Sequence, residues 1–120
     1  MTQAVPRVIA LLDDLFFQMK IAETAKHIGV ELKVATNTDA LLGLLDLLPQ
    51  LVIVDLNSRS QPIQSIEKVR AAQPQLPIIG FLSHVQRELA VQAQNAGCSE
   101  VMPRSAFTQR LAEILTAARS

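Results

Sequence analysis

The chain has 120 residues, which is a typical length for one domain. Hydrophobic residues make up 49% of it, so a disordered or low-complexity chain is excluded. Eleven lysine and arginine residues balance eleven aspartate and glutamate residues, which gives no support for direct nucleic-acid or membrane binding. The single cysteine, Cys98, cannot form an internal disulfide, and no apolar run approaches the ~18 residues of a membrane span. We therefore expect one cytoplasmic domain over residues 1–120.

Short apolar runs alternate along the chain with segments of helical periodicity. Residues 8–12, 51–54 and 76–82 are continuously apolar and are followed by a polar residue, as in fully buried strands. Residues 31–35 alternate between apolar and polar, which is typical of a strand nearer the edge of a sheet. Residues 101–102 are the last and weakest strand candidate.

A helical segment follows each strand candidate. The first extends from Leu15 to a stop at Gly29. The second follows a predicted N-cap at Thr38-Asp39 and ends before Pro49. The apolar residues that we expect on buried helix faces recur at helical spacing. They are Leu15, Met19, Ala22 and Ala25 in the first helix; Leu41, Leu44, Leu45 and Leu48 in the second; Ile63, Ile66 and Val69 in the third; Leu89, Ala90, Ala93 and Ala96 in the fourth; and Phe107, Leu111, Ile114, Leu115 and Ala118 in the last.

Five strand–helix pairs in strict alternation predict an α/β fold. Strands that alternate with helices form a parallel sheet covered on both faces, so we expect a doubly wound five-stranded parallel sheet with flanking helices. Ligands of such folds bind outside the carboxyl ends of the strands. The residues that follow the strands are therefore the candidates for a functional site.

Polar residues stand at four of these strand ends. Asp13 and Asp14 follow the first strand, and Asp55 follows the third. Ser83 follows the fourth, and Arg104 lies near the end of the fifth. Each alone has an ordinary explanation as a helix cap, a turn residue or a surface cation. Together, three carboxylates at one edge require a cation, and carboxylate oxygens are ligands that Mg²⁺ prefers. A hydroxyl and a fixed cation beside them suit a phosphoryl group, which an aspartate can accept covalently.

In order and spacing these residues resemble the receiver domain of two-component response regulators, the CheY-like superfamily, over almost the whole chain. The resemblance implies a flavodoxin-like fold. It also implies that Asp13, Asp14 and Asp55 bind Mg²⁺ weakly together with the backbone carbonyl of Asn57. Asp55 then corresponds to the phosphoryl acceptor, and Ser83 to the hydroxyl that contacts the phosphoryl oxygen.

Three departures from the family pattern accompany this resemblance. Arg104-Ser105 stands where the family has a lysine followed by a proline, and arginine does not simply reproduce the lysine contact. Val101 stands where the family usually has a tyrosine or phenylalanine that rotates inward upon activation. The loop after Asp55 lacks the family's proline and glycine. The parts that sense and transmit the phosphoryl group are thus altered.

The resemblance leaves two functions open. In the first, a histidine kinase or a phosphotransfer protein phosphorylates Asp55, and the domain signals to a downstream protein target rather than turning over a metabolite. In the second, a degenerate receiver acts as a phosphorylation-independent interaction or dimerisation module. Leu42 and Leu47, off the centre of the leucine stripe, are either exposed leucines or part of such a surface. An output domain beyond residue 120 is equally open.

Two other functions are disfavoured by the sequence. A small phosphohydrolase would need an Asp-x-Asp pair after the first strand, and a nucleotide-binding domain would need a glycine-rich turn after Leu12. His27 and His84 are too isolated to form a metal or phosphorelay site, although His84 is adjacent to Ser83 and could touch a phosphoryl group. We expect Cys98 to be a small buried hydrophobic residue.

Overall fold

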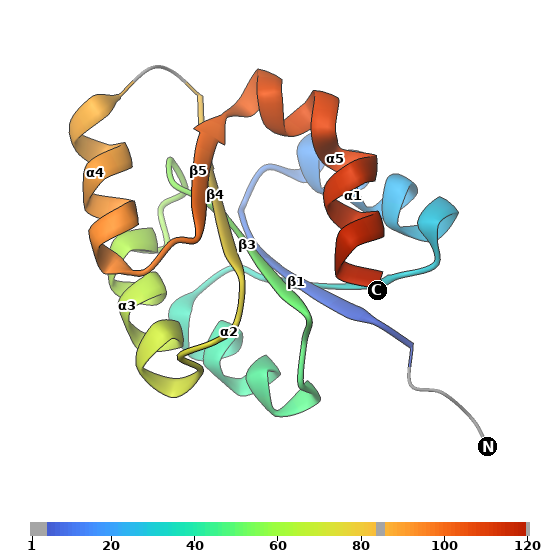
Figure 1. Ribbon diagram of the computed structural model, residues 1–120, viewed down its shortest axis with the longest axis horizontal. Coiled ribbons are helices and arrows are strands. Elements are labelled where there is room, and N and C mark those ends of the chain that lie inside the picture. Colours follow the sequence, from blue (N-terminus) through green and yellow to red (C-terminus); the bar gives the residue numbers. More distant parts are fainter. Residues whose placement is uncertain (1–4, 84–85, 120) are drawn as a thin grey trace.

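The computed structural model describes residues 5–83 and 86–119, and it shows five strands and five α-helices in alternation (Figure 1). A short 3₁₀ turn follows the second helix. The elements are β1 (Arg7–Leu11), α1 (Leu15–Ile28), β2 (Glu31–Ala35), α2 (Thr38–Leu44), the 3₁₀ turn (Leu45–Leu47), β3 (Leu51–Asp55), α3 (Pro62–Ala72), β4 (Ile78–Leu82), α4 (Arg87–Ala96), β5 (Glu100–Pro103) and α5 (Arg104–Arg119). The predicted doubly wound α/β fold is confirmed.

The five strands form one parallel sheet in the order β2-β1-β3-β4-β5. From β1 the chain crosses to β2 on one side, and later to β3 on the other, so the strand order reverses beside β1. Leu11 pairs with Val54, and Leu82 pairs with Pro103. This register brings the residues after β1, β3, β4 and β5 out at the same edge of the sheet, beside the reversal point where ligands bind in such folds.

Helices cover both faces of the sheet, which is why β1 and β3 are apolar on both sides. Helices α1 and α5 lie on one face, and α2, α3 and α4 on the other (Figure 1). Val8 and Ala10 of β1 pack with α1 and α5, whereas Ile9 and Leu11 pack in the other core. Among the described residues, no helix is both long and apolar enough to cross a membrane.

The buried face of α1 differs from the predicted one. Leu15 and Met19 are 70% and 68% exposed, and the buried residues are Phe17, Ile21 and Ala25. The predicted stripe was therefore wrong except at Ala25. Both stripes repeat at helical spacing, but they lie two residues apart, which is roughly 200° around the helix. Periodicity could not choose between them, since α1 carries large apolar residues on both sides.

Helix α2 begins and ends differently from the prediction. Its N-cap is Asn37, whose side chain accepts a hydrogen bond from the Ala40 N–H (2.8 Å), rather than Thr38-Asp39. Leu41 and Leu45 are buried as predicted, but Leu48 is 74% exposed. The prediction for Leu48 was wrong because the helix tightens into a 3₁₀ turn and Leu48 then adopts a left-handed backbone with φ of 57°.

The remaining elements agree with the sequence patterns to within two residues. The third, fourth and fifth helices bury the expected faces, with Phe107, Leu111, Ile114 and Leu115 of α5 fully within the core. Both predicted glycine stops are present. Gly97 ends α4 with φ of 133°, and a Cβ there would lie 2.9 Å from the Arg70 side chain, so only glycine fits.

Candidate functional site

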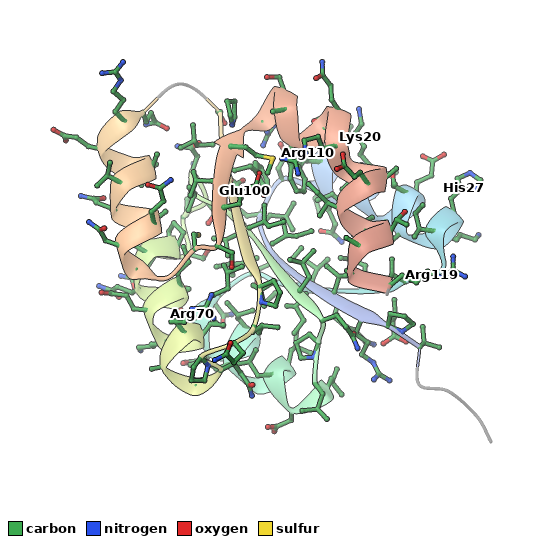
Figure 2. All side chains as sticks on the ribbon, in the orientation of Figure 1. Lys20, His27, Arg70, Glu100, Arg110 and Arg119 are labelled. Atoms are coloured by element: carbon green, nitrogen blue, oxygen red, sulfur yellow. The ribbon has the colours of Figure 1, made fainter. Side chains whose placement is uncertain are left out.

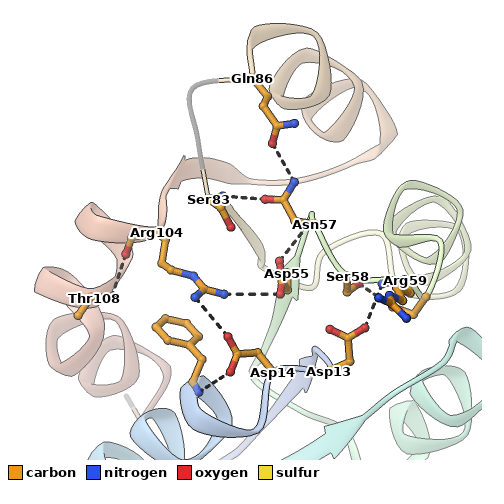
Figure 3. A network of polar contacts seen from close by, with 12 residues as sticks. Asp13, Asp14, Asp55, Asn57, Ser58, Arg59, Ser83, Gln86, Arg104 and Thr108 are labelled. Atoms are coloured by element: carbon orange, nitrogen blue, oxygen red, sulfur yellow. Dashed lines mark hydrogen bonds and ion pairs between the residues drawn. The ribbon is translucent and has the colours of Figure 1, made fainter.

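Five polar residues predicted from the sequence meet at the carboxyl edge of the sheet: Asp13, Asp14, Asp55, Ser83 and Arg104 (Figure 3). They come from the ends of four different strands, as the strand register requires. His84 falls outside the described residues. The contacts made at this edge decide what each side chain can do.

Asp55 is the last residue of β3, and its side chain is only 5% exposed. Its Oδ1 accepts a hydrogen bond from the Asn57 N–H (2.9 Å), and its Oδ2 lies 3.9 Å from Nη2 of Arg104. Burial raises the pKa of this carboxyl group, and the Asn57 N–H and the Arg104 charge only partly oppose the rise. Asp55 is thus a buried carboxylate with one oxygen directed at a cation.

Asp14 has a structural role at the start of α1. Its Oδ1 accepts the Phe17 N–H (3.1 Å) as the N-cap, and its Oδ2 lies 3.3 Å from Nη1 of Arg104. The Phe17 N–H lowers the pKa of Asp14 most, with further lowering from Arg104. The helix-cap role that the sequence left open is therefore present, and Asp14 shares the cation of Asp55.

Arg104 is the first residue of α5 and joins the two carboxylates. Its guanidinium carbon lies 4.4 Å from the ring centroid of Phe17 and 5.6 Å from that of Phe81. Its Nε is buried without a hydrogen-bond partner among the described residues. The guanidinium therefore lies beside two aromatic rings. Its terminal nitrogens face Asp14 and Asp55 (Figure 3).

Asn57 fastens the β3–α3 loop to the β4–α4 connection. Its side-chain oxygen accepts the Ser83 N–H (2.7 Å), and its Nδ2 donates to the side-chain oxygen of Gln86 (2.8 Å). The exposed Ser83 is thereby held beside the residues that follow Asp55. The sequence suggested a role for the Asn57 backbone carbonyl and gave no signal for this side-chain bridge.

Sequence reasoning also missed Phe17 and Phe81, which support Arg104. Phe17 is three residues after the cap residue Asp14, so a correct cap assignment would have placed it in the first turn beside the site. Phe81 pairs with Asp55 across β3 and β4, so the strand register alone places it next to the acceptor candidate. The centroids of their rings are 5.0 Å apart, and both rings pack against the ring of Phe107 in α5.

The arrangement does not fit a divalent metal ion. Both oxygens of Asp14 and both oxygens of Asp55 already face a nitrogen. Asp13 is exposed, and its Oδ2 accepts the backbone N–H of Arg59 (3.1 Å). Within the described part of the chain, no three acidic, histidine or cysteine side chains are grouped to hold a metal. Carboxylate oxygens are ligands that suit Mg²⁺. The position between the Asp14 and Asp55 carboxylates, however, is occupied by the guanidinium of Arg104.

No protein-family model matches the chain, and no curated protein matches it in sequence. Solved structures match it in fold. A CheY-like receiver domain protein from Methanospirillum hungatei JF-1 has a TM-score of 0.79 at 16% identity, covering 96% of this chain and 97% of that one. The receiver domain of NtrX from Brucella abortus has a TM-score of 0.78 at 23% identity, covering 92% of this chain and 96% of that one.

A third match is the chemotaxis response regulator CheY4 of Vibrio cholerae, with a TM-score of 0.80 at 17% identity. It covers 96% of this chain and 99% of that one. At such identities the likeness concerns the fold alone. Over nearly its whole length, therefore, the chain has the CheY-like fold of response regulator receiver domains.

Proposed function

We propose that the chain is a cytoplasmic signalling receiver whose Asp55 accepts a phosphoryl group from the phosphohistidine of a histidine kinase or a phosphotransfer protein. One observation carries the proposal. The buried carboxylate of Asp55, at the carboxyl end of a central strand, faces the Arg104 guanidinium 3.9 Å away, beside the strand-order reversal of a receiver fold. An aspartate nucleophile beside a fixed cation is an arrangement suited to phosphoryl transfer.

The transfer needs no proton from the protein when the second ring nitrogen of the phosphohistidine carries a proton, because the imidazole then leaves as a neutral group. An Asp55 oxygen forms a bond to phosphorus while the bond between phosphorus and the donor nitrogen breaks, and that electron pair leaves with the imidazole. Arg104 carries five N–H donors, and its contacts at 3.3 and 3.9 Å use them incompletely. A phosphoryl group on Asp55 would add oxygens within reach of this guanidinium, which recognises phosphate through paired hydrogen bonds.

Ser83 is the second group that we assign to the phosphoryl. It directly follows β4, whose residue Phe81 pairs with Asp55, and its backbone is held by the Asn57 side chain. Ser83 is exposed, so its hydroxyl is accessible for a hydrogen bond to a phosphoryl oxygen. In this proposal Asp55 is the nucleophile, Arg104 neutralises the developing charge, and Ser83 orients the transferred group.

A second function is favoured by a specific observation. Arg104 already pairs with Asp14 and Asp55, and Val101, where the family usually has an aromatic ring, is a half-buried aliphatic residue. A domain fixed in this state would act as a phosphorylation-independent module that binds a partner protein or a second copy of itself. The two functions differ in whether the acceptor reacts.

The experiment is intact-mass analysis after incubation with acetyl phosphate, in the presence and absence of Mg²⁺. We expect the mass of one phosphoryl group to be added to the native chain and not to Asp55→Asn. Asp46→Asn is the matched control, because Asp46 is exposed on the 3₁₀ turn that precedes β3, away from the carboxyl edge of the sheet, and it should still be labelled. A native chain that stays unlabelled under both conditions would leave the interaction module as the function.

A further inference from the structure

We infer that the guanidinium of Arg104 is the resident cation of this site and that it excludes a divalent metal ion from the position between Asp14 and Asp55. The inference deepens the proposed function, because it identifies the charge that the acceptor site uses. It concerns cation selectivity, which can be measured without any phosphoryl donor.

The first step is the position of the charge. Nη1 of Arg104 lies 3.3 Å from Asp14 Oδ2, and Nη2 lies 3.9 Å from Asp55 Oδ2, so one planar group spans both carboxylates (Figure 3). These two oxygens are also the ones that a metal ion at this edge would need, since the other oxygen of each residue accepts a backbone N–H. The guanidinium and a metal ion therefore compete for the same two atoms.

The second step is that aromatic rings of the core hold the Arg104 guanidinium in place. Its guanidinium stacks 4.4 Å from the Phe17 ring centroid, and the Phe81 ring lies 5.6 Å away on the same core. Phe17 is 8% exposed and Phe81 is fully buried, so this platform is fixed by the packing of α1 and β4. A guanidinium stacks on an aromatic face better than a flexible ammonium group does.

The third step is that both carboxylates are also fixed. The Phe17 N–H holds Asp14 as a helix cap, and the Asn57 N–H holds Asp55. Asp13, the remaining acidic candidate, lies on the loop side with Arg59. A metal ion would have to displace Arg104 from two ion pairs and from its aromatic contact at once. It would otherwise sit next to a like charge, which disfavours its binding.

The test measures binding of Mn²⁺, which substitutes for Mg²⁺ at oxygen sites and broadens nearby NMR signals. We expect the native chain to show no saturable broadening at Asp14 and Asp55. Arg104→Met should bind Mn²⁺ at least about tenfold more tightly, because it frees the two oxygens but keeps a long side chain on the rings. Arg104→Lys should also gain affinity, since an ammonium group is held less firmly by Phe17.

Two further variants complete the design. Phe17→Leu keeps every charge and removes the aromatic platform, so it should raise Mn²⁺ affinity even if Arg104→Met fails to fold. Arg110→Met is the matched control, because Arg110 lies on α5 and pairs with Glu100 at the other end of β5 (Figure 2). It should leave Mn²⁺ binding at the native level.

Two results would overturn the inference. One is saturable Mn²⁺ binding by the native chain that is as tight as in Arg104→Met. The other is an absence of binding in the native chain and in every folded variant, which would mean that the carboxylates, and not Arg104, determine the outcome. Neither result depends on whether Asp55 can be phosphorylated, so failure of the proposed function is recognised separately.

Discussion

Asp14 uses its two carboxylate oxygens for two different purposes at the head of α1. One oxygen caps the helix at the Phe17 N–H, and the other pairs with Arg104. The group retains a lowered pKa, mainly through the Phe17 hydrogen bond. A lowered pKa in the folded chain stabilises the fold above the unfolded pKa, and this stabilisation is lost as the pH falls through the folded value. Asp14 thus serves both the fold and the site.

We predict that Asp14→Ala lowers the free energy of unfolding by about 1 kcal/mol or more, since loss of an N-cap alone typically costs that much. Asp14→Asn should lose less, because its side-chain oxygen can still accept the Phe17 N–H. Asp13→Ala is the control and should change stability little, as Asp13 is exposed and lies outside the cap. Urea denaturation at neutral pH measures all three. Equal losses of stability in Asp14→Ala and Asp14→Asn would contradict the capping role of Asp14.

The contribution of Asp55 to the stability of the fold should depend on pH in the opposite direction from that of Asp14. Burial raises its pKa above the ordinary 3.8, so the unfolded chain releases this proton more readily than the folded chain. The native chain therefore loses stability as the pH rises above the unfolded pKa, and the loss is complete above the folded pKa. We predict that the stability of Asp55→Asn relative to the native chain increases as the pH rises from about 3.5 towards 7, a window that brackets the ordinary carboxyl pKa. Denaturation of both chains at several pH values measures this difference in stability. A difference that stays constant or falls as the pH rises would refute the prediction.

At the scale of the elements, α1 presents two apolar sides with different roles. Phe17 is 8% exposed and packs against Phe81 and Phe107, whereas Phe16 is 87% exposed. Leu15 and Met19 accompany Phe16 on the exposed side. The sequence assigned the wrong side to the core because both sides repeat at helical spacing.

We predict that Phe17→Ala destabilises the fold by roughly 3–5 kcal/mol, which is the usual cost of removing a core phenylalanine. Phe16→Ala removes an equal side chain one residue earlier and should change stability by less than about 0.5 kcal/mol, as surface substitutions do. Thermal and chemical denaturation of the pair test the assignment of the faces. A large loss in Phe16→Ala would show that the buried side had been assigned incorrectly.

At the scale of the whole molecule, the sequence predicted the layers and the edge of the sheet at which the candidate site residues gather, because both follow from strand–helix alternation. Asp55 and Ser83 could be placed at one edge since parallel strands end together. The contacts within the site could not be predicted. The position of Arg104 on Phe17 depends on which way α1 faces, and the Asn57 bridge depends on the paths of two loops.

The packing of the same layers predicts which elements would change when Asp55 is phosphorylated. Arg104 contacts Phe17 and Phe81, and both adjoin Phe107, so the site is connected to the α1 and α5 face. Val101, on the α4 side, has no ring that could report the change. A ligand shifts a two-state equilibrium only by its differential affinity for the two states. On phosphorylation we predict amide shift changes in α1 and early α5, and smaller ones across Arg87–Ala96. The reverse distribution in an NMR spectrum would contradict this route.

The most direct test of the central claim is to locate the phosphoryl group. Borohydride reduces an aspartyl phosphate to homoserine and leaves a free aspartate unchanged, so peptide mass analysis of the treated chain identifies the acceptor. We predict homoserine at position 55 after incubation with acetyl phosphate and its absence in the untreated chain. Homoserine at position 13 or 14 instead, or none at any position in a folded chain, would contradict the assignment of Asp55 as the acceptor.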